Sequence, residues 1–499
     1  MRRKHLLVSV LTGLGLLVLS GCTGLVGPVG GGLERVPPDT SVPKAVDGRY
    51  IVVFDEGRIP AGVEAAIAAL GGEVVQRFPE IGVLVIVSDE EDFALRLKEI
   101  QGVEEAGPDK LWMLPRPQAV KIFNPAEASA SPGSGDLMYD VFQWDIKRVG
   151  GIPETWAIET GRNAVVAILD TGVNASHPDL TPNYLYGKSY VDIDVPLPPW
   201  ITVPALEDGS PEDWHMHGTH VAGAIAAVMG GNLPDRYGGG VTGVAPEAGI
   251  ANYKVLMLVE VQLPDGSFFT GIGFTSWIIA GLIEAVDDGV DVINMSLGGY
   301  DLLTDPDGLA AFIAYARATQ YAWERGTLIV AAAGNAAWDS TNNPWKHAPS
   351  MTPAALAVVA TGPFDELAVY SNYGAFNADV AAPGGNIPDQ EYSGWEFDYL
   401  CLNTFSLENY RHYYYSQDIY GQPTPPDYPD RAHYVTAAGT SMAAPKVSGV
   451  AALIYSQNPG ITPTEVVRIL EATAEDLGAP GYDLTFGWGM VNALGAVTR

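Results

Sequence analysis

From about residue 140 onward, short apolar runs alternate with helical patterns. The runs that are long enough for one buried strand each cover residues 164–169, 250–255, 290–295 and 327–333. Such alternation favours a parallel sheet with helices on both faces. We therefore predict an α/β fold for residues 139–499, with functional groups at the carboxyl ends of its strands.

A smaller unit precedes this region. It has strand-like runs and two amphipathic helical stretches, at residues 50–54, 62–70, 74–78, 83–87, 90–100 and 103–112. Their strand–helix–strand–strand–helix–strand order predicts a ferredoxin-like α+β domain, which we assign to residues 44–113. Residues 114–138 are rich in Pro, Ser, Gly and Ala, which is typical of an exposed linker that proteases cut.

The first residues have the pattern of a targeting segment. A positively charged start precedes an apolar run over residues 6–19. This run is shorter than the roughly 18 residues of a membrane-spanning helix, so residues 1–22 are predicted to be a signal peptide. The run ends in LSGC, which resembles a bacterial lipoprotein cleavage box with Cys22 as the lipidated residue, and residues 23–43 would be its tether. The alternative is an ordinary secretory signal; either way we expect export, to the cell envelope or the medium.

Composition restricts the partners. The chain of 499 residues is 47% hydrophobic and 17% charged, which is typical of a globular protein. Its formal net charge of −32 disfavours a nucleic-acid partner, because phosphates would be repelled. The acidic surface would favour divalent cations such as calcium. The alternative is a highly charged surface that binds no specific ligand. If Cys22 is acylated, Cys401 has no partner in the chain, and no disulfide is expected.

Three residues at predicted element ends suggest nucleophilic catalysis. Asp170 ends an apolar strand, and His217 and Ser441 each open a predicted helix. An aspartate that orients a histidine, which in turn activates a serine, performs acyl transfer. Asn335 follows another buried strand and could donate a hydrogen bond to the oxyanion. Taken alone, a strand-end aspartate is more often a turn or helix cap.

The segments AILDTGV, HGTHVAG, AAAGN and GTSMAAP resemble the signature segments of the subtilisin-like serine proteases, the subtilases. The layout is similar to that of the fervidolysin-like branch. The resemblance implies a subtilisin-like fold and a broad serine endopeptidase that acts on proteins and peptides. It also implies that residues 44–113 are a propeptide, which assists folding and inhibits the enzyme until a cut between residues 113 and 138. We further expect a monomer with no organic cofactor and no membrane contact except a possible lipid anchor.

Carried over residue by residue, the resemblance makes Asp170, His217 and Ser441 the catalytic triad and Asn335 the oxyanion donor. It also implies a set of residues that line the primary specificity pocket: Ser296, Leu297 and Gly298 on one wall, and Ala333 and Gly334 on the other. Because these walls are uncharged, we expect an apolar preference before the cleaved bond.

Structural calcium is a further implication of the resemblance. Asp179 in the segment HPDL matches a family position that often binds calcium together with the loop after the histidine helix. In this chain that loop contains Asn232 and Asp235, whose oxygen atoms suit a hard cation. The alternative is that Asp179 caps a turn.

The histidine cluster leaves rival interpretations open. His215, His217 and His220 superficially resemble a zinc-binding run, but the acidic ligand that usually accompanies one is missing. A non-enzymatic lipoprotein is a second rival. An α/β-hydrolase esterase is disfavoured, because GTSMA lacks the second glycine of that nucleophile elbow. We expect His220 to be structural and His215 to face solvent near the cleft. The insertions at residues 192–213 and 386–433 receive no role.

Overall fold

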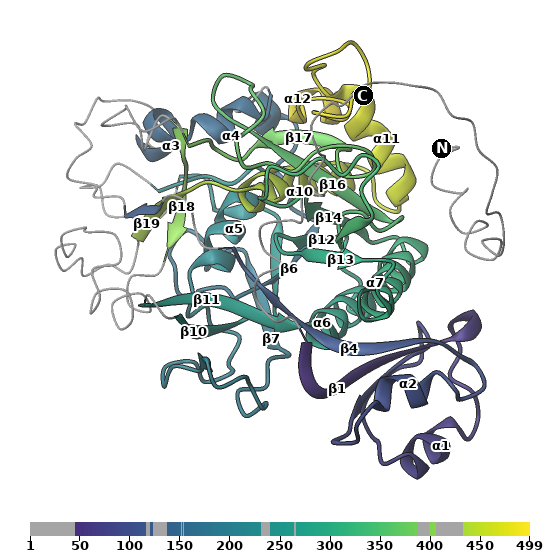
Figure 1. The fold of residues 1–499 in the computed structure, drawn as a ribbon. Coiled ribbons are helices and arrows are strands. Elements are labelled where there is room, and N and C mark those ends of the chain that lie inside the picture. The colour runs from purple at the N-terminus through teal and green to yellow at the C-terminus, as the bar shows by residue number, and fades with distance from the viewer. Residues whose placement is uncertain are drawn as a thin grey trace, which may run out of the picture.

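The computed structural model describes residues 45–115, 120–122, 137–150, 152, 154–230, 240–263, 266–387, 399–405 and 433–499. Its centre is a parallel sheet with strand order β17-β16-β14-β12-β6-β9-β7 (Figure 1). These strands are β6 (Val165–Asp170), β7 (Tyr184–Ser189), β9 (Gly249–Lys254), β12 (Val292–Met295), β14 (Leu328–Ala332), β16 (Ala355–Thr361) and β17 (Val380–Pro383). The predicted parallel α/β sheet is confirmed, with strand ends shifted by a few residues.

Helices cover both faces of this sheet because its strands are apolar on both sides. In β6, Val166 and Ile168 belong to one core, whereas Ala167 and Leu169 belong to another. The first core is shared with α5 (His217–Ala226) and α10 (Thr440–Gln457), and the second with α6 (Thr275–Asp287) and α7 (Pro306–Glu324). Side chains that alternate along a strand thus anchor two layers of helices.

Helix α10, which contains Ser441 in its first turn, lies in the core of the protein. Every residue of α10 from Thr440 to Ser456 is buried, including Lys446. A helix that is buried on every side lies in the protein interior rather than at its surface. The shorter helices α11 (Pro463–Thr473) and α12 (Ala493–Val497) pack beside it, and α3 (Leu137–Phe142) and α4 (Trp144–Arg148) open this part of the chain.

The amino-terminal elements follow the predicted order. They are β1 (Ala45–Phe54), α1 (Val63–Ala69), β2 (Glu73–Phe78), β3 (Val83–Val87), α2 (Phe93–Leu97) and β4 (Val103–Met113). They enclose an apolar core of their own. Their sheet continues into the rest of the chain, because β4 pairs antiparallel with β11 (Gly266–Phe274), and the order is β2-β3-β1-β4-β11-β10-β8. We expected a compact separate unit, and the shared sheet is a feature that the sequence did not reveal.

The continuous sheet ends in β10 (Met257–Leu263) and in β8 (Ile201–Thr202), which lies in the insertion at residues 192–213. Two further sheets complete the fold. A three-member sheet has the order β18-β19-β5, with β5 (Val120–Ile122), β18 (Cys401–Phe405) and β19 (His433–Ala437). A pair of short strands, β13 (Gly299–Leu302) and β15 (Trp345–Ala348), lies beside the central sheet. Across the described ranges, no helix is long and apolar enough to cross a membrane.

Polar contacts fasten the amino-terminal unit to helices α6 and α7. The buried carboxylate of Asp109 accepts hydrogen bonds from the backbone and hydroxyl of Ser276, at 3.0 and 2.6 Å, and pairs with Arg49. Lys110 forms an ion pair with Asp301. In α7, Arg317 donates to the carbonyl of Phe54. The two parts therefore form a specific interface.

Candidate active site

The end of β6 and the start of α5 bring an aspartate and a histidine together. Asp170 is fully buried, and its Oδ1 lies 2.8 Å from Nδ1 of His217. The backbone N–H of Thr171 also donates to Oδ1, at 2.7 Å. Gly218 permits this close approach, because a Cβ there would lie 2.1 Å from the carbonyl of Gly172. This contact orients the imidazole, with its Nε2 left for a second partner.

Asp213 organises the turn before α5, a role that was not predicted from the sequence. Its carboxylate accepts from the N–H groups of His215, Met216 and Thr219, at 2.8–2.9 Å, and from the hydroxyl of Thr171. Met216, the residue before the helix, has a φ of 112°, which is a strained conformation for a side chain of this size. An aspartate just ahead of a predicted helix start is typical of a capping residue, and that signal could have identified it.

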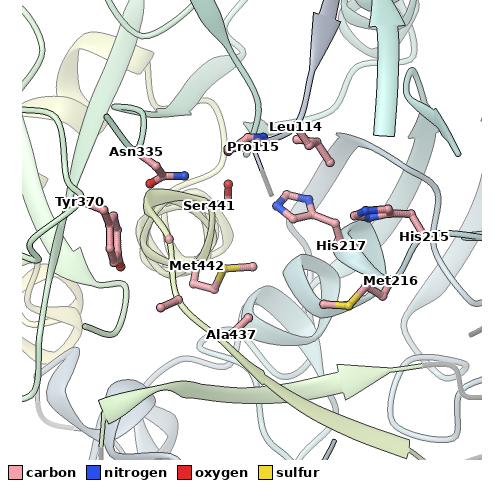
Figure 2. Close-up of a pocket in the computed structure, with 12 residues that line it drawn as sticks. Leu114, Pro115, His215, Met216, His217, Asn335, Tyr370, Ala437, Ser441 and Met442 are labelled. Carbon is pink, nitrogen blue, oxygen red and sulfur yellow. The ribbon is translucent and has the colours of Figure 1, made fainter. Parts of the chain in front are cut away.

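Ser441 lies in the first turn of α10 and faces the same pocket as His217 (Figure 2). Its Oγ donates to the carbonyl of Ser296 at 3.1 Å, and the Ser296 hydroxyl donates to the carbonyl of Ser441 at 2.8 Å. Among the described contacts, Ser441 and His217 are not hydrogen-bonded to each other.

Asn335 lies beside Ser441 with its amide oriented by the backbone. Its Oδ1 accepts from the N–H and the hydroxyl of Thr440, both at 2.8 Å. The amide nitrogen therefore points toward the Ser441 side of the pocket, as Figure 2 shows. The donor required for an oxyanion is thus available next to the start of α10, where backbone N–H groups also point outward.

The electrostatics differ among the three clustered histidines. Burial lowers the pKa of His217, but the charge and hydrogen bond of Asp170, with the charge of Asp213, outweigh burial and raise this pKa above its ordinary value. Burial lowers the pKa of His215 to about 4 and that of His220 to about 3. Of the three histidines, His217 is the one whose pKa is raised, so its imidazole is the strongest base of the cluster.

The two neighbouring histidines differ in their hydrogen bonds. His220 is buried, and its Nε2 lies 3.1 Å from the carbonyl of Cys401, which confirms the expected structural role. His215 is only 3% exposed and neither ring nitrogen has a hydrogen-bond partner in the structure, so the expectation that it faces solvent is wrong. The backbone N–H of His215 donates to the carboxylate of Asp213, and the turn held in this way places the imidazole in the interior. No group of three metal-ligating side chains exists in the described ranges, which disfavours the zinc interpretation there.

The residues assigned to the specificity pocket lie around a histidine. Ser296, Leu297 and Gly298 follow β12, and Ala333 and Gly334 follow β14. A Cβ on Gly298 would lie 2.4 Å from the ring of His347, and one on Gly334 would lie 2.9 Å from it. His347 is almost fully buried between the two glycines. It comes from β15, remote in sequence, and no local pattern could have identified it.

The carboxyl end of the amino-terminal unit lies in this site. The pocket has an empty volume of about 560 Å³, part of it open to solvent, and its lining includes Leu114 and Pro115 together with His217, Asn335 and Ser441. The backbone N–H of Leu114 donates to the carbonyl of Gly271 in β11, at 2.9 Å. On the other side, β5 pairs antiparallel with β19, the strand that leads into Ser441. Leu114 and β5 are thus each held by a strand of the catalytic region, Leu114 by β11 and β5 by β19.

The remaining expectations concern calcium and lipid. Oδ2 of Asp179 accepts from the backbone of Val241 and the hydroxyl of Tyr434, at 3.1 and 2.8 Å. These donors bind Oδ2, and they come from residues remote in the sequence rather than from the turn that contains Asp179. The other expected ligands, Asn232 and Asp235, lie outside the described residues, as does Cys22. Calcium binding stays a prediction.

The protein has a parallel sheet with helices on both faces. One pocket contains a histidine that is hydrogen-bonded to an aspartate, together with a serine at the start of a helix. These features define a class of α/β serine hydrolases. The model of the subtilase family matches residues 161–489, and the chain belongs to that family. It is 32% identical to thermitase of Thermoactinomyces vulgaris, over 69% of this chain and 92% of thermitase. It is 28% identical to fervidolysin of Fervidobacterium pennivorans over 89% of this chain, but spans only 58% of fervidolysin's length.

Solved structures agree with this fold. The crystal structure of fervidolysin aligns with a TM-score of 0.62 at 23% identity and covers 91% of this chain. That of the epidermin leader peptide processing serine protease of Staphylococcus aureus aligns with a TM-score of 0.66 at 21% identity, over 90% of this chain and 97% of the other. At these identities, both likenesses show the fold alone.

Proposed function

We propose that the protein is an exported serine endopeptidase that hydrolyses proteins through Asp170, His217 and Ser441. His217 accepts the proton of the Ser441 hydroxyl as the oxygen attacks the substrate carbonyl, and Asp170 holds the imidazole in the required tautomer. The proton then passes to the leaving amine. Water attacks the acyl-enzyme with the same histidine as base, which restores the serine.

Charge that develops on the substrate oxygen is stabilised by donors already in place. The amide nitrogen of Asn335 and the backbone N–H of Ser441 would bind this oxyanion, since Thr440 already fixes the asparagine oxygen. Each preorganised donor of this kind lowers the activation free energy by about 3–4 kcal/mol. The start of α10 adds its positive dipole end.

The position of Leu114 and Pro115 in the pocket supports the proposal that the enzyme is made as a self-processing zymogen. Leu114 is held on β11, β5 is held on β19, and Leu114 and Pro115 line the same pocket as Ser441. The carboxyl end of the amino-terminal unit thus lies where a substrate would bind. Residues 44–113 would then act as the inhibitory propeptide, and the cut would fall between Pro115 and Val120, within the wider linker expected from the sequence.

For specificity we propose a broad preference for uncharged residues before the cleaved bond. The walls at Ser296–Gly298 and Ala333–Gly334 are uncharged, and the ring of His347 limits the space between them. Small apolar side chains should therefore be favoured over large ones. The export signal, the Cys22 lipid, the structural calcium and the monomeric state remain part of the proposal on the sequence grounds given above.

Covalent labelling tests the nucleophile. A fluorophosphonate should label the wild-type protein at Ser441 once, and a Ser441→Ala protein should stay unlabelled. Loss of activity with a zinc chelator, together with no labelling, would favour the metal-hydrolase rival. Labelling of neither protein, with no proteolysis, would favour a non-enzymatic surface lipoprotein.

A further inference from the structure

A hairpin and an insertion build an apolar layer along the outer side of the cleft. The layer, which we call the outer wall, consists of residues from β8, β10, β11 and the 190–203 stretch: Tyr190, Val191, Val195, Leu197, Trp200, Ile201, Val203, Met257, Val259, Val261, Phe268, Ile272 and Phe274. The insertion to which we could assign no role thus covers one face of the β10–β11 hairpin. Figure 1 shows this hairpin extending beside β4.

The outer wall contacts the chain segment that lies in the cleft. In β4, Leu111 pairs with Phe274 and Met113 with Ile272, and paired residues of antiparallel strands share one face of the sheet. Leu111 belongs to the apolar cluster of the wall and is 4% exposed, and Met113 packs against the same cluster.

The opposite face of the same segment is covered as well. Trp112 and Leu114 belong to the core that includes Ile278 and Leu297 under the cleft. The indole nitrogen of Trp112 also donates to the hydroxyl of Thr275, at 2.7 Å. Apolar side chains that alternate along one strand are therefore enclosed on both sides, one pair by the body of the protein and one pair by the outer wall.

We propose that the outer wall is a further substrate-binding surface of the mature enzyme. It would select extended polypeptides with apolar side chains at the two positions that Leu111 and Met113 occupy in this structure. A charged side chain there would lose its hydration against an apolar layer without a partner. This inference rests on the proposed function, because it assumes that substrates replace the enzyme's own segment on β11.

The test compares two peptides as substrates of the mature enzyme, which is obtained by letting the full-length protein process itself. One peptide has the sequence of residues 109–122, and the other carries Leu111→Lys and Met113→Lys. We expect the lysine peptide to have a kcat/KM at least about 10-fold lower, the size of effect that a misfit in an apolar pocket produces. Equal kcat/KM values for the two peptides would overturn the outer wall as a selective surface while leaving the protease intact.

A matched pair of variants locates the effect. Ile272→Thr places a hydroxyl opposite the Met113 position, and should reduce the discrimination between the peptides at least threefold. Ile469→Thr makes the same change outside the outer wall, at a side chain that packs against the core shared with α5 and α10. It should keep the wild-type discrimination. The same loss in both variants, or in neither, would contradict the assignment.

A measurement that needs no catalysis separates failure of the inference from failure of the proposed function. In full-length Ser441→Ala, adding Leu111→Lys and Met113→Lys should speed amide exchange of Leu114 at least 10-fold, because the segment is no longer held on β11. Val75→Lys, at a 43% exposed position on β2, is the control and should change nothing there. Unchanged exchange with both lysines would overturn the inference, even in a protein without protease activity.

Discussion

His217 Nδ1 lies 2.8 Å from Asp170 Oδ1, although 47 positions separate the two residues in the chain. The contact exists because β6 ends where α5 begins, and because Gly218 leaves room for the two elements to approach. It holds the imidazole with one nitrogen toward a buried carboxylate and the other toward the pocket that contains Ser441. The proposed chemistry depends on this orientation.

Asp170→Asn should lower kcat about 10⁴-fold, because the histidine would lose both its tautomer and its stabilising charge. His217 must be neutral to act as a base, so kcat/KM falls as the pH drops through its pKa. Since Asp170 helps to raise that pKa, the wild-type midpoint should lie above 6.5 and the variant midpoint should be lower. A pH profile of both proteins on one peptide checks this, and identical midpoints would contradict it.

Asn335→Ala should reduce kcat by about 10²–10³ with little change in KM, because its amide would bind the oxygen only as charge develops. The loss of the acceptor for Thr440 could also weaken the start of α10. Thermal unfolding of the variant in a Ser441→Ala background serves as the control for that effect. An increase in KM that accounts for the whole loss would argue against an oxyanion role.

His215→Leu should remove part of the acid sensitivity of the fold. Buried among Asp213, His217 and Lys254, His215 has its pKa lowered to about 4, so it is neutral in the folded protein and takes up a proton on unfolding. Between pH 6.5 and 4 the unfolded state binds more protons, and stability falls as the pH falls, by about 1.4 kcal/mol per unit for one group. Denaturant unfolding in a Ser441→Ala background should show a slope smaller by about that amount. Stability at pH 7 should hardly change, because neither ring nitrogen has a partner.

A buried ion pair joins the start of the catalytic region to α10. Lys446 Nζ lies 2.7 Å from Asp145 Oδ2, and both side chains are fully buried. Lys446→Met would leave the carboxylate uncompensated and should destabilise the protein by about 3–5 kcal/mol. Adding Asp145→Leu should recover much of this loss. A double-mutant cycle measured by urea unfolding gives the coupling, and two additive losses would show that the pair does not interact.

The features that the sequence predicted are those with local patterns. Buried strand runs identified β6, β9, β12 and β14, and the residues at their ends and at two helix starts supplied Asp170, His217, Ser441 and Asn335. Each of these sites depends on a strand end or a helix start. Such positions are fixed by short-range periodicity and by turn chemistry.

The features that remained hidden depend on contacts between distant segments. His347 enters the pocket from β15, and β4 joins β11 across more than 150 positions, which no local pattern specifies. The burial of His215 is a third case, because it follows from the hydrogen bonds of Asp213 rather than from the polarity of the histidine. These are tertiary effects, and they decide what surrounds the triad.

Intact-mass analysis of the purified wild-type and Ser441→Ala proteins tests the central proposal most directly. We expect the wild-type protein to lose an amino-terminal piece that ends between residues 115 and 120, because Leu114 and Pro115 line the same pocket as Ser441. The Ser441→Ala protein should keep both parts in one chain. The same cut in the purified Ser441→Ala protein would contradict self-processing by this serine.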